Sequence, residues 1–433
     1  MKRVALCIPT YERCDCIRDL IETCASYYLE YGIDIYLFDS SKNNAVEQFA
    51  VDVQGQYRDR LYYIRLSPDM HTGEKCFKIY EGSGYPLETY DYLWICSDSV
   101  QFTRSAVEKI MNALEADCDV VAVDPRDLYH VGSKTYSDAN SFFADCAWGM
   151  SLLGASILKV DTVLSGKDWN QEEYLRDKIV DFPHVSFMFH QILKLPEFSG
   201  AHVSLEDREY RSSVYKKASG WYKIVFYIIC ESWVQVIEGL PNLYTDKEGA
   251  IFKGGKYSLG SIRRFRQLRM EGIFDFGIFL KYFSVWNRVC AVSRGSLFML
   301  SVTPRFCLQR DYDNRKNRLL KALESFRKAH DKIFLYGAGR VGAVYAMYFD
   351  REQFAFEGFC VSDAQGKSSY MDHPLYAVDA IDLNARTGVA VALQEQNAQD
   401  VLGLLEKRGM DKTHIFYSQE FYKMISYELG YRD

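Results

Sequence analysis

Polar side chains follow three apolar runs in the first hundred residues, and their types suit the binding of a nucleoside diphosphate. The residues are Pro9, Thr10, Tyr11 and Glu12 after the first run, Asp39 and Ser41 after the second, and Ser97 and Asp98 after the third. The carboxylate of Asp39 could accept a hydrogen bond from a base or ribose, and that of Asp98 could hold a divalent cation against a diphosphate. Single Asp and Ser residues at strand ends more often cap helices or form turns, so the prediction depends on the three occurring together.

These residues meet only if the three apolar runs are neighbouring strands of one parallel sheet. The run from Val4 to Ile8 is apolar on both faces, which suits an interior strand covered by helices, and Pro9 is expected to end it. Apolar and amphipathic segments then alternate, a pattern that indicates βαβ units. Because the carboxyl ends of parallel strands lie at one edge of the sheet, we expect a single binding cleft there.

The segments CIPTYER, LFDSSKNN, MHTGEKCFKIYEGS and YLWICSDSV resemble the motifs of family 2-type inverting glycosyltransferases of the GT-A fold, in particular the abequosyltransferase-like branch. The resemblance covers about the first 200 residues. It implies a nucleotide-sugar donor and a divalent metal, Mn²⁺ or Mg²⁺, at Asp98. This chain keeps one carboxylate where the family has two or three, so phosphates and water would complete the metal's shell. Lys75 and Lys78 on the preceding helix would help to neutralise the diphosphate, unless they are solvated surface lysines.

Glycosyl transfer with inversion needs a general base that deprotonates the acceptor hydroxyl while the nucleoside diphosphate leaves. The resemblance places this base well after the metal motif. Asp181 in KIVDFPHVSF is the best positional match, ahead of Glu172 and Glu173, and its alternative role is a helix N-cap. Trp148 and Gly149 are predicted to line the acceptor site, since aromatic faces stack on sugar rings, and a buried core tryptophan is the alternative.

A basic, aromatic-rich stretch follows the first 215 residues. Residues 253–318 carry fourteen Lys or Arg against four Asp or Glu, in a chain whose formal net charge is -6. The arginines of GSIRRFRQLRM, interleaved with aromatic residues, could lie on an anionic membrane surface, which would suit a lipid-linked acceptor. The alternative is a helical subdomain whose arginines face solvent or a partner subunit.

A third unit begins with a glycine motif. YGAGRVG supplies Gly337, Gly339 and Gly342 directly after the apolar run KIFLY, and Asp363 ends the next strand-like run. This is the spacing of the dinucleotide-binding fingerprint, whose glycines let a phosphate approach a helix N-terminus. The motif predicts a Rossmann-like domain, and the glycines serve either a bound nucleotide or packing alone.

The composition excludes several classes of protein. A net charge of -6 argues against a dedicated nucleic-acid binder, and the spacings of zinc sites are absent. Twelve scattered cysteines without a signal-peptide pattern predict reduced thiols in a cytoplasm. The longest apolar run, WYKIVFYIIC, is too short to span a bilayer.

We therefore predict an α/β protein with a GT-A domain over residues 1–215, a helical, basic region over 216–330 and a Rossmann-like domain over 331–433. The predicted function is an inverting hexosyltransferase of surface polysaccharide synthesis. It would act on a glycan or polyprenyl-linked acceptor as a cytoplasmic homo-oligomer at the inner face of the plasma membrane. UDP is the expected donor nucleotide because Asp39 suits a pyrimidine imide. Two alternatives stay open: a non-catalytic nucleotide-sugar-binding or assembly subunit, and an NAD-dependent activity of the C-terminal unit.

Overall fold

The computed structural model describes residues 2–57, 60–125, 131–165, 181–206, 209–216, 220–364, 366, 368–384 and 386–431. The chain forms two compact units, one of Met1–Tyr215 with Lys223–Val302 and the other of Lys216–Tyr222 with Thr303–Asp433. The predicted middle region of residues 216–330 is thus divided between the two units. Among the described helices, none has both the length and the apolar character that crossing a membrane requires.

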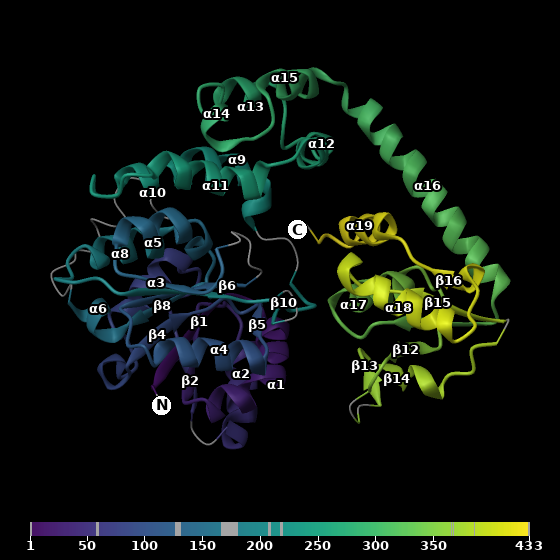
Figure 1. Ribbon diagram of the computed structural model, residues 1–433, viewed down its shortest axis with the longest axis horizontal. Helices are drawn as coiled ribbons and strands as arrows, with labels where there is room; N and C mark the ends of the chain where they lie inside the picture. Colours follow the sequence, from purple (N-terminus) through teal and green to yellow (C-terminus); the bar gives the residue numbers. More distant parts are fainter. Residues whose placement is uncertain are drawn as a thin grey trace. The chain divides into compact units, whose positions relative to one another are not determined.

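An eight-stranded, parallel-rich sheet lies at the centre of the first unit, in the strand order β3-β2-β1-β4-β8-β6-β9-β7 (Figure 1). Its strands are β1 (Val4–Thr10), β2 (Ile33–Asp39), β3 (Leu61–Arg65), β4 (Tyr92–Ile95), β6 (Val120–Asp124), β7 (Lys134–Tyr136), β8 (Ser156–Lys159) and β9 (Gly200–Ser204). β1 is parallel to both of its neighbours, β2 and β4. A separate ladder pairs β5 (Val100–Phe102) with β10 (Tyr210–Ser212).

Helices cover both faces of this sheet, which is why every residue of β1 and β2 is buried. One face packs on α1 (Cys14–Glu30), α2 (Ala45–Gln54) and α4 (Arg104–Leu114). The other lies under α3 (Thr72–Tyr80) and α8 (Pro183–Ile192) (Figure 1). The prediction of an interior strand at the start of the chain is therefore confirmed.

Pro9 lies inside β1 and does not end it, contrary to the sequence prediction. In a parallel strand, alternate residues direct their backbone groups to opposite neighbours. The carbonyl of Cys7 accepts from the backbone N–H of Cys96, so Cys7 faces the β4 side. Pro9, two residues further on, faces the same side, beyond the end of β4 at Ile95. Its missing N–H therefore costs no ladder hydrogen bond between the described strands.

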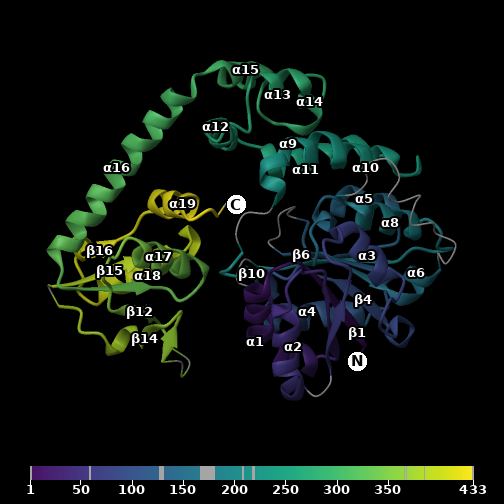
Figure 2. The same cartoon turned by 180° about the vertical axis from the view of Figure 1, so that it is seen from behind.

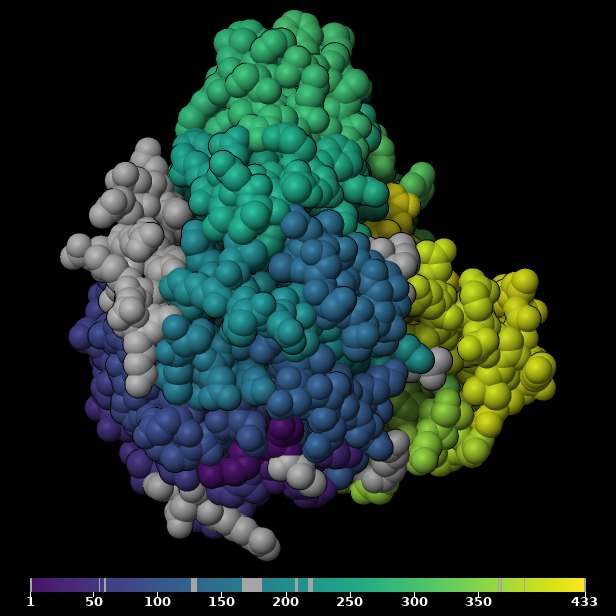
Figure 3. All heavy atoms as spheres, turned by 60° about the vertical axis from the view of Figure 1, so that its left-hand side comes forward, coloured from purple at the N-terminus to yellow at the C-terminus, as the bar shows by residue number. Residues whose placement is uncertain are grey.

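Short helices complete the first unit. They are α5 (Ala139–Cys146), α6 (Val160–Leu164), α9 (Val225–Tyr227), a π-helical turn (Ile228–Trp233), α10 (Val234–Gly239), α11 (Lys247–Leu259), α12 (Ile262–Met270), α13 (Phe276–Lys281), α14 (Trp286–Val289) and α15 (Arg294–Val302). The rings of Phe226, Phe265 and Phe274 pack around Trp286, with centroids 5.8, 5.9 and 6.2 Å away. Figure 3 shows the teal side chains of this segment packed on the blue ones of the sheet domain. The arginine-rich stretch is thus a packed helical segment.

The second unit contains a six-stranded sheet in the order β13-β14-β12-β11-β15-β16. Its strands are β11 (Lys332–Tyr336), β12 (Gly358–Val361), β13 (Ser369–Tyr370), β14 (His373–Ala377), β15 (Thr387–Val391) and β16 (Ile415–Phe416). Its helices are α16 (Arg305–Ala329), a single long helix in Figure 2, with α17 (Arg340–Arg351), α18 (Glu395–Lys407) and α19 (Gln419–Glu428). All of these strands pair in parallel except β13.

Alternation along β11 divides the second unit into two hydrophobic cores. Ile333 and Leu335 pack with residues of α16, α17 and α19, whereas Phe334 and Tyr336 pack with residues of α18. A parallel-rich sheet with helices on both faces is an α/β arrangement, and the Rossmann-like assignment of this unit stays a prediction. The predicted fold class, an α/β sheet domain with a helical segment and a further C-terminal sheet domain, is therefore confirmed.

Candidate functional site

A buried polar cluster lies at the carboxyl ends of β1, β2 and β4 and includes one side chain from α3. We call it the strand-end cluster: Thr10, Asp39, Ser41, Lys75 and Asp98. The parallel register places Thr10 opposite Asp39. The Thr10 hydroxyl donates to Oδ2 of Asp98 at 3.0 Å. Each of the five residues is at most 3% exposed. The structure thus brings Asp39 and Asp98, far apart in the sequence, to one edge of the sheet.

Four groups surround the carboxylate of Asp39, which is 0% exposed. The backbone N–H and the hydroxyl of Ser41 donate to its Oδ1 at 2.8 and 2.5 Å. The Tyr63 hydroxyl donates to Oδ2 at 3.0 Å, and Nη1 of Arg65 lies 3.5 Å from the same oxygen. Asp39 therefore ties the turn after β2 to the edge strand β3. A nucleotide base that contacts Asp39 must replace or share one of these hydrogen bonds.

Asp98 has both carboxylate oxygens engaged. Besides the Thr10 contact on Oδ2, Nη1 of Arg13 forms an ion pair with Oδ1 at 3.2 Å. The neighbours of Asp98 in the chain are Ser97 and Ser99, whose hydroxyls lie 3.1 Å apart. Across the part of the chain that the structure describes, no three His, Cys, Asp or Glu side chains gather as metal ligands would.

Mg²⁺ and Mn²⁺ prefer a shell of oxygen ligands that includes uncommitted carboxylates. A carboxylate that already accepts from a hydroxyl and pairs with a guanidinium does not meet that need, so these residues do not fit a divalent-cation site. The metal role of Asp98 stays a prediction that the described contacts do not support.

Lys75 is the lysine of α3 that reaches the strand-end cluster. Its Nζ donates to the carbonyl oxygen of Thr10 at 2.6 Å, and its side chain is buried. Burial lowers the pKa of Lys75 to about 8, although the negative charges of Asp39 and Asp98 act in the opposite direction. The predicted donor-binding residue Lys78 is partly exposed and pairs with Glu81 at 2.9 Å.

A capping box fixes the start of α3. The ring Nδ1 of His71 accepts from the backbone N–H of Gly73 at 3.2 Å, and the Glu74 carboxylate accepts from the backbone N–H of His71 at 2.9 Å. With its start fixed in this way, the helix buries Lys75 and Ile79 on the same face. Lys78 lies on the partly exposed side.

The turn after β1 presents the accessible residues of this edge. Tyr11 is 38% exposed, and its hydroxyl donates to Asp69 at 2.6 Å. Glu12 is exposed and adopts a left-handed conformation, with φ of 51°. Its backbone N–H donates to the Ser41 hydroxyl at 2.6 Å, which connects this turn to the turn after β2. The predicted donor-binding residues after β1 and β2 therefore share one hydrogen-bonded network.

The predicted catalytic and acceptor residues also lie together. Asp181 is half-buried and accepts from the Ser232 hydroxyl at 2.7 Å. The N-cap position of α8 belongs to Phe182, so Asp181 does not serve as an ordinary cap. The Trp148 ring lies 6.5 Å from the Phe182 ring and 4.9 Å from the Trp233 ring, between centroids. Glu172 and Glu173, the sequence alternatives to Asp181, fall outside the described residues.

The segment that follows Trp148 connects this neighbourhood with the end of β4. It opens with a turn over Gly149–Ser151. The carbonyl of Leu153 accepts from the backbone N–H of Ser97 at 3.3 Å. The ring Nε2 of His184 lies 3.2 Å from the carbonyl oxygen of Ser151, and burial lowers the pKa of His184 to about 4. A neutral His184 thus holds α8 against the segment that starts at Gly149.

The C-terminal glycines divide into two groups. A Cβ at Gly337 would lie 2.8 Å from the carbonyl oxygen of Ala392, and one at Gly342 would lie 1.9 Å from that of Gly337. Close packing of β11, α17 and β15 therefore requires these two glycines, whatever binds there. Gly339 is exposed at the start of α17, where a Cβ would meet no described atom within 4 Å. Asp363 is exposed after β12. Nucleotide binding at Gly339 and Asp363 stays a prediction.

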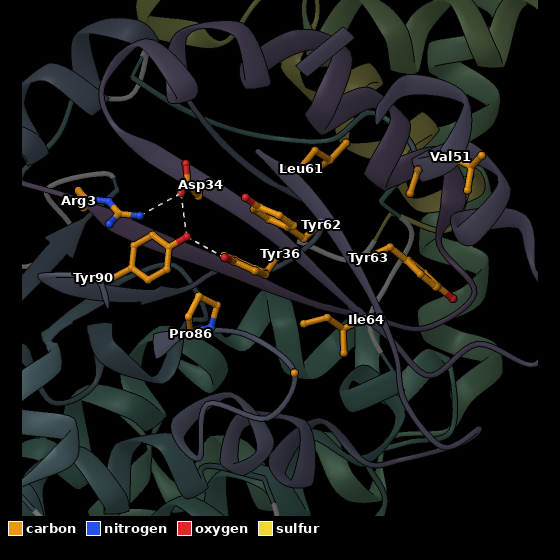
Figure 4. A pocket seen from close by; sticks show the side chains of 12 residues that line it. Arg3, Asp34, Tyr36, Val51, Leu61, Tyr62, Tyr63, Ile64, Pro86 and Tyr90 are labelled. Carbon is orange, nitrogen blue, oxygen red and sulfur yellow. Dashed lines mark hydrogen bonds and ion pairs between the residues drawn. The ribbon is translucent and has the colours of Figure 1, made fainter. Parts of the chain in front are cut away.

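A hollow of about 490 Å³ lies along the edge strand β3 (Figure 4). Asp34 accepts from the Tyr90 hydroxyl at 2.7 Å, and that hydroxyl is 2.7 Å from the Tyr36 hydroxyl. Arg3 lies 3.8 Å from the same carboxylate. Asp34 and Asp39 stand near opposite ends of β2, and Tyr63, which also lines the hollow, donates to Asp39 at 3.0 Å.

Sequence analysis did not assign a role to Arg13, Tyr63 or Arg65. It gave Lys75 and Lys78 the same role, and the structure brings Lys75 alone of these two lysines into the strand-end cluster. Arg13 stands in the same CIPTYER motif as Thr10, and that proximity was the available signal. Tyr63 and Arg65 alternate along β3, a pattern that places both on one face but does not name their partner.

No protein-family model and no curated protein matches this sequence. Solved structures resemble parts of its fold. The 1-349 segment of TarS from S. aureus in complex with UDP is 10% identical with a TM-score of 0.41, and the match covers 72% of this chain and 91% of that segment. The mannosyltransferase PcManGT from Pyrobaculum calidifontis, in complex with GDP-Man and Mn²⁺, is 12% identical with a TM-score of 0.40, covering 70% and 86%. Glucosyl-3-phosphoglycerate synthase from Mycobacterium tuberculosis, with Mn²⁺ and UDP-glucose, is 12% identical with a TM-score of 0.35, covering 55% and 80%.

Lys75 predicts a specific pH dependence of stability. Its folded-state pKa of about 8 lies below its ordinary value of 10.5, so the unfolded chain binds more protons between these two values. The Lys75 contribution to the free energy of unfolding therefore rises with pH through this window. Between pH 7.5 and 9.5 we expect wild type to gain on the order of 1–2 kcal/mol relative to Lys75→Met. Urea denaturation of both proteins at both pH values measures the difference in their free energies of unfolding. If this difference is the same at pH 7.5 and 9.5, the surroundings of Lys75 do not disfavour its charged form.

Proposed function

We propose that this chain is an inverting glycosyltransferase that moves a sugar from a nucleotide-sugar donor to a glycan or polyprenyl-linked acceptor. The observation that carries the proposal is the strand-end cluster, in which Asp39, Asp98 and the Lys75 amine occupy the carboxyl edge of a parallel sheet. Open α/β sheets bind ligands at this edge. A UDP-sugar is the first donor to test, because the carboxylate of Asp39 suits a pyrimidine imide.

The proposed donor site combines a buried cation with an accessible rim. Below pH 8 Lys75 carries a positive charge next to the Thr10 carbonyl, where it would attract the diphosphate. Tyr11 and Glu12 form the exposed rim on one side, and the partly exposed Ser97 lies at the end of β4. These are the residues that we assign to the nucleoside diphosphate.

Asp181 is the proposed general base. Ser232 holds its Oδ2, and Oδ1 has no partner among the described residues, so that oxygen can accept the proton of an acceptor hydroxyl. As the acceptor oxygen bonds to the anomeric carbon, the bond from that carbon to the diphosphate breaks and its electron pair leaves with the diphosphate. The half-buried Trp148 would offer a ring face to the acceptor sugar.

Replacement of Asp181 by Asn tests the proposed base. We expect Asp181→Asn to lower kcat by about 10²- to 10⁴-fold while UDP affinity changes little, because the amide cannot take a proton. The measurement is release of UDP from UDP-sugars in the presence of glycan or polyprenyl-phosphate acceptors. Asp161→Asn, an exposed carboxylate on α6, is the matched control. If wild type binds UDP but releases none with any mixture, the chain is a nucleotide-sugar-binding subunit and not a transferase.

A lipid-linked acceptor would bring the chain to a membrane surface, and helices α13 and α15 carry an apolar patch suited to one. The α13–α15 patch consists of Phe276, Leu280, Phe283, Phe298, Met299 and Val302, all exposed by at least 43%. Arg294 supplies positive charge within it, 4.7 Å from the Phe283 ring centroid, whereas the exposed Lys281 pairs with Glu231 at 2.7 Å. Apolar side chains interleaved with cations favour an anionic lipid surface, so we propose peripheral attachment at the cytoplasmic membrane.

Sedimentation with vesicles tests this attachment. We expect the chain to bind phosphatidylglycerol-containing vesicles, and Leu280→Glu with Met299→Glu to weaken that binding by about 10-fold or more, since two apolar side chains are lost from the membrane contact. Leu243→Glu replaces an apolar residue of similar exposure, 64%, outside the patch. Equal binding by the double variant and by this control would show that the patch does not contact lipid.

A further inference from the structure

Arg13 occupies the place at Asp98 where the sequence resemblance implies a divalent cation. Its Nη1 lies 3.2 Å from Oδ1 of Asp98. The Asp98 side chain is 5% exposed and that of Arg13 is 39% exposed, so the carboxylate is enclosed and the guanidinium reaches solvent. The result is a fixed positive charge at the open side of the strand-end cluster.

The backbone fixes Arg13 at the junction of β1 and α1. Glu12, with φ of 51°, reverses the chain direction after the strand, and Arg13 follows as the N-cap residue of α1. The carbonyl of Arg13 accepts from the backbone N–H of Ile17 at 3.1 Å. A side chain that leaves from a fixed backbone position and is tethered by an ion pair loses little conformational freedom when a ligand binds.

The guanidinium of Arg13 has more N–H donors than its contact with Asp98 uses. It carries five N–H groups, and within the described residues its partner is the Asp98 carboxylate. A guanidinium presents its donors as a planar fork that matches two phosphate oxygens, a geometry that a lysine amine lacks. One edge of Arg13 can therefore stay on Asp98 while other donors contact a diphosphate.

We propose that Arg13, held by Asp98, takes the place of a divalent metal at the donor diphosphate, so that this chain binds nucleoside diphosphates without a divalent cation. The inference rests on the proposed function. A cation approaching Asp98 would have to displace both the guanidinium and the Thr10 hydroxyl from its oxygens. In transfer, the bond between the anomeric carbon and the diphosphate breaks, and Arg13 stabilises the negative charge that develops on the departing oxygen.

Calorimetric titration with UDP and with GDP, in EDTA and in MgCl₂ or MnCl₂ at equal ionic strength, tests the proposal. For wild type we expect affinities that agree within about 2-fold between these conditions. Arg13→Ala should weaken binding by about 10- to 100-fold in EDTA, the usual effect of losing a charge-assisted contact. Arg13→Lys should fall between wild type and Arg13→Ala because it keeps the charge and loses the fork.

The control is Arg18→Ala on the same helix. The Arg18 guanidinium lies over the Phe49 ring, 4.7 Å from its centroid, and 3.8 Å from Glu22. The UDP affinity of Arg18→Ala should therefore match that of wild type. Circular dichroism melts confirm that each variant is folded. If wild type binds only with Mg²⁺ or Mn²⁺, the Arg13 inference is overturned while the proposed function stands. If neither nucleotide binds under any condition, the proposed function fails as well.

Discussion

The buried carboxylate of Asp98 is the constraint on which the proposed site depends. An ionised carboxylate at 3% exposure is stable only when its oxygens are paired. The Thr10 hydroxyl and the Arg13 guanidinium meet this need, and each comes from the end of β1 or the turn after it. The same pairing that makes burial possible also joins the ends of β1 and β4 and leaves a cation facing the edge of the sheet.

The buried carboxylate of Asp39 also needs partners for its oxygens, and different residues supply them. Ser41, Tyr63 and Arg65 enclose it, so the turn after β2 and the strand β3 are held where the turn after β1 can contact them. Lys75 of α3 donates its amine to the Thr10 carbonyl, and burial lowers its pKa although the charges of Asp39 and Asp98 act in the opposite direction. The charged groups of the strand-end cluster are thus held in position before a ligand binds.

The sequence was sufficient for the sheet and for the meeting of its strand ends, because hydrophobic pattern and parallel pairing determine both. It was insufficient where a single backbone angle or helix start decides which side chain points inward. Arg13, which reaches Asp98, follows the left-handed Glu12, and Lys75 lies in the first turns of a helix that begins with the capping box at His71. Pro9 was expected to end β1, but it lies within the strand. Because β4 ends before it reaches Pro9, the missing N–H of Pro9 removes no hydrogen bond between the described strands. The partner of Asp181, Ser232, lies 51 positions away and could not be read from any local pattern.

The most direct test of the account is a crystal structure of the chain soaked with UDP and EDTA. The account predicts the diphosphate at the carboxyl ends of β1 and β4, with its oxygens within hydrogen-bond distance of Arg13 and Lys75. UDP bound at the turn around Gly339, or in the hollow along β3, with the strand-end cluster unchanged, would contradict it.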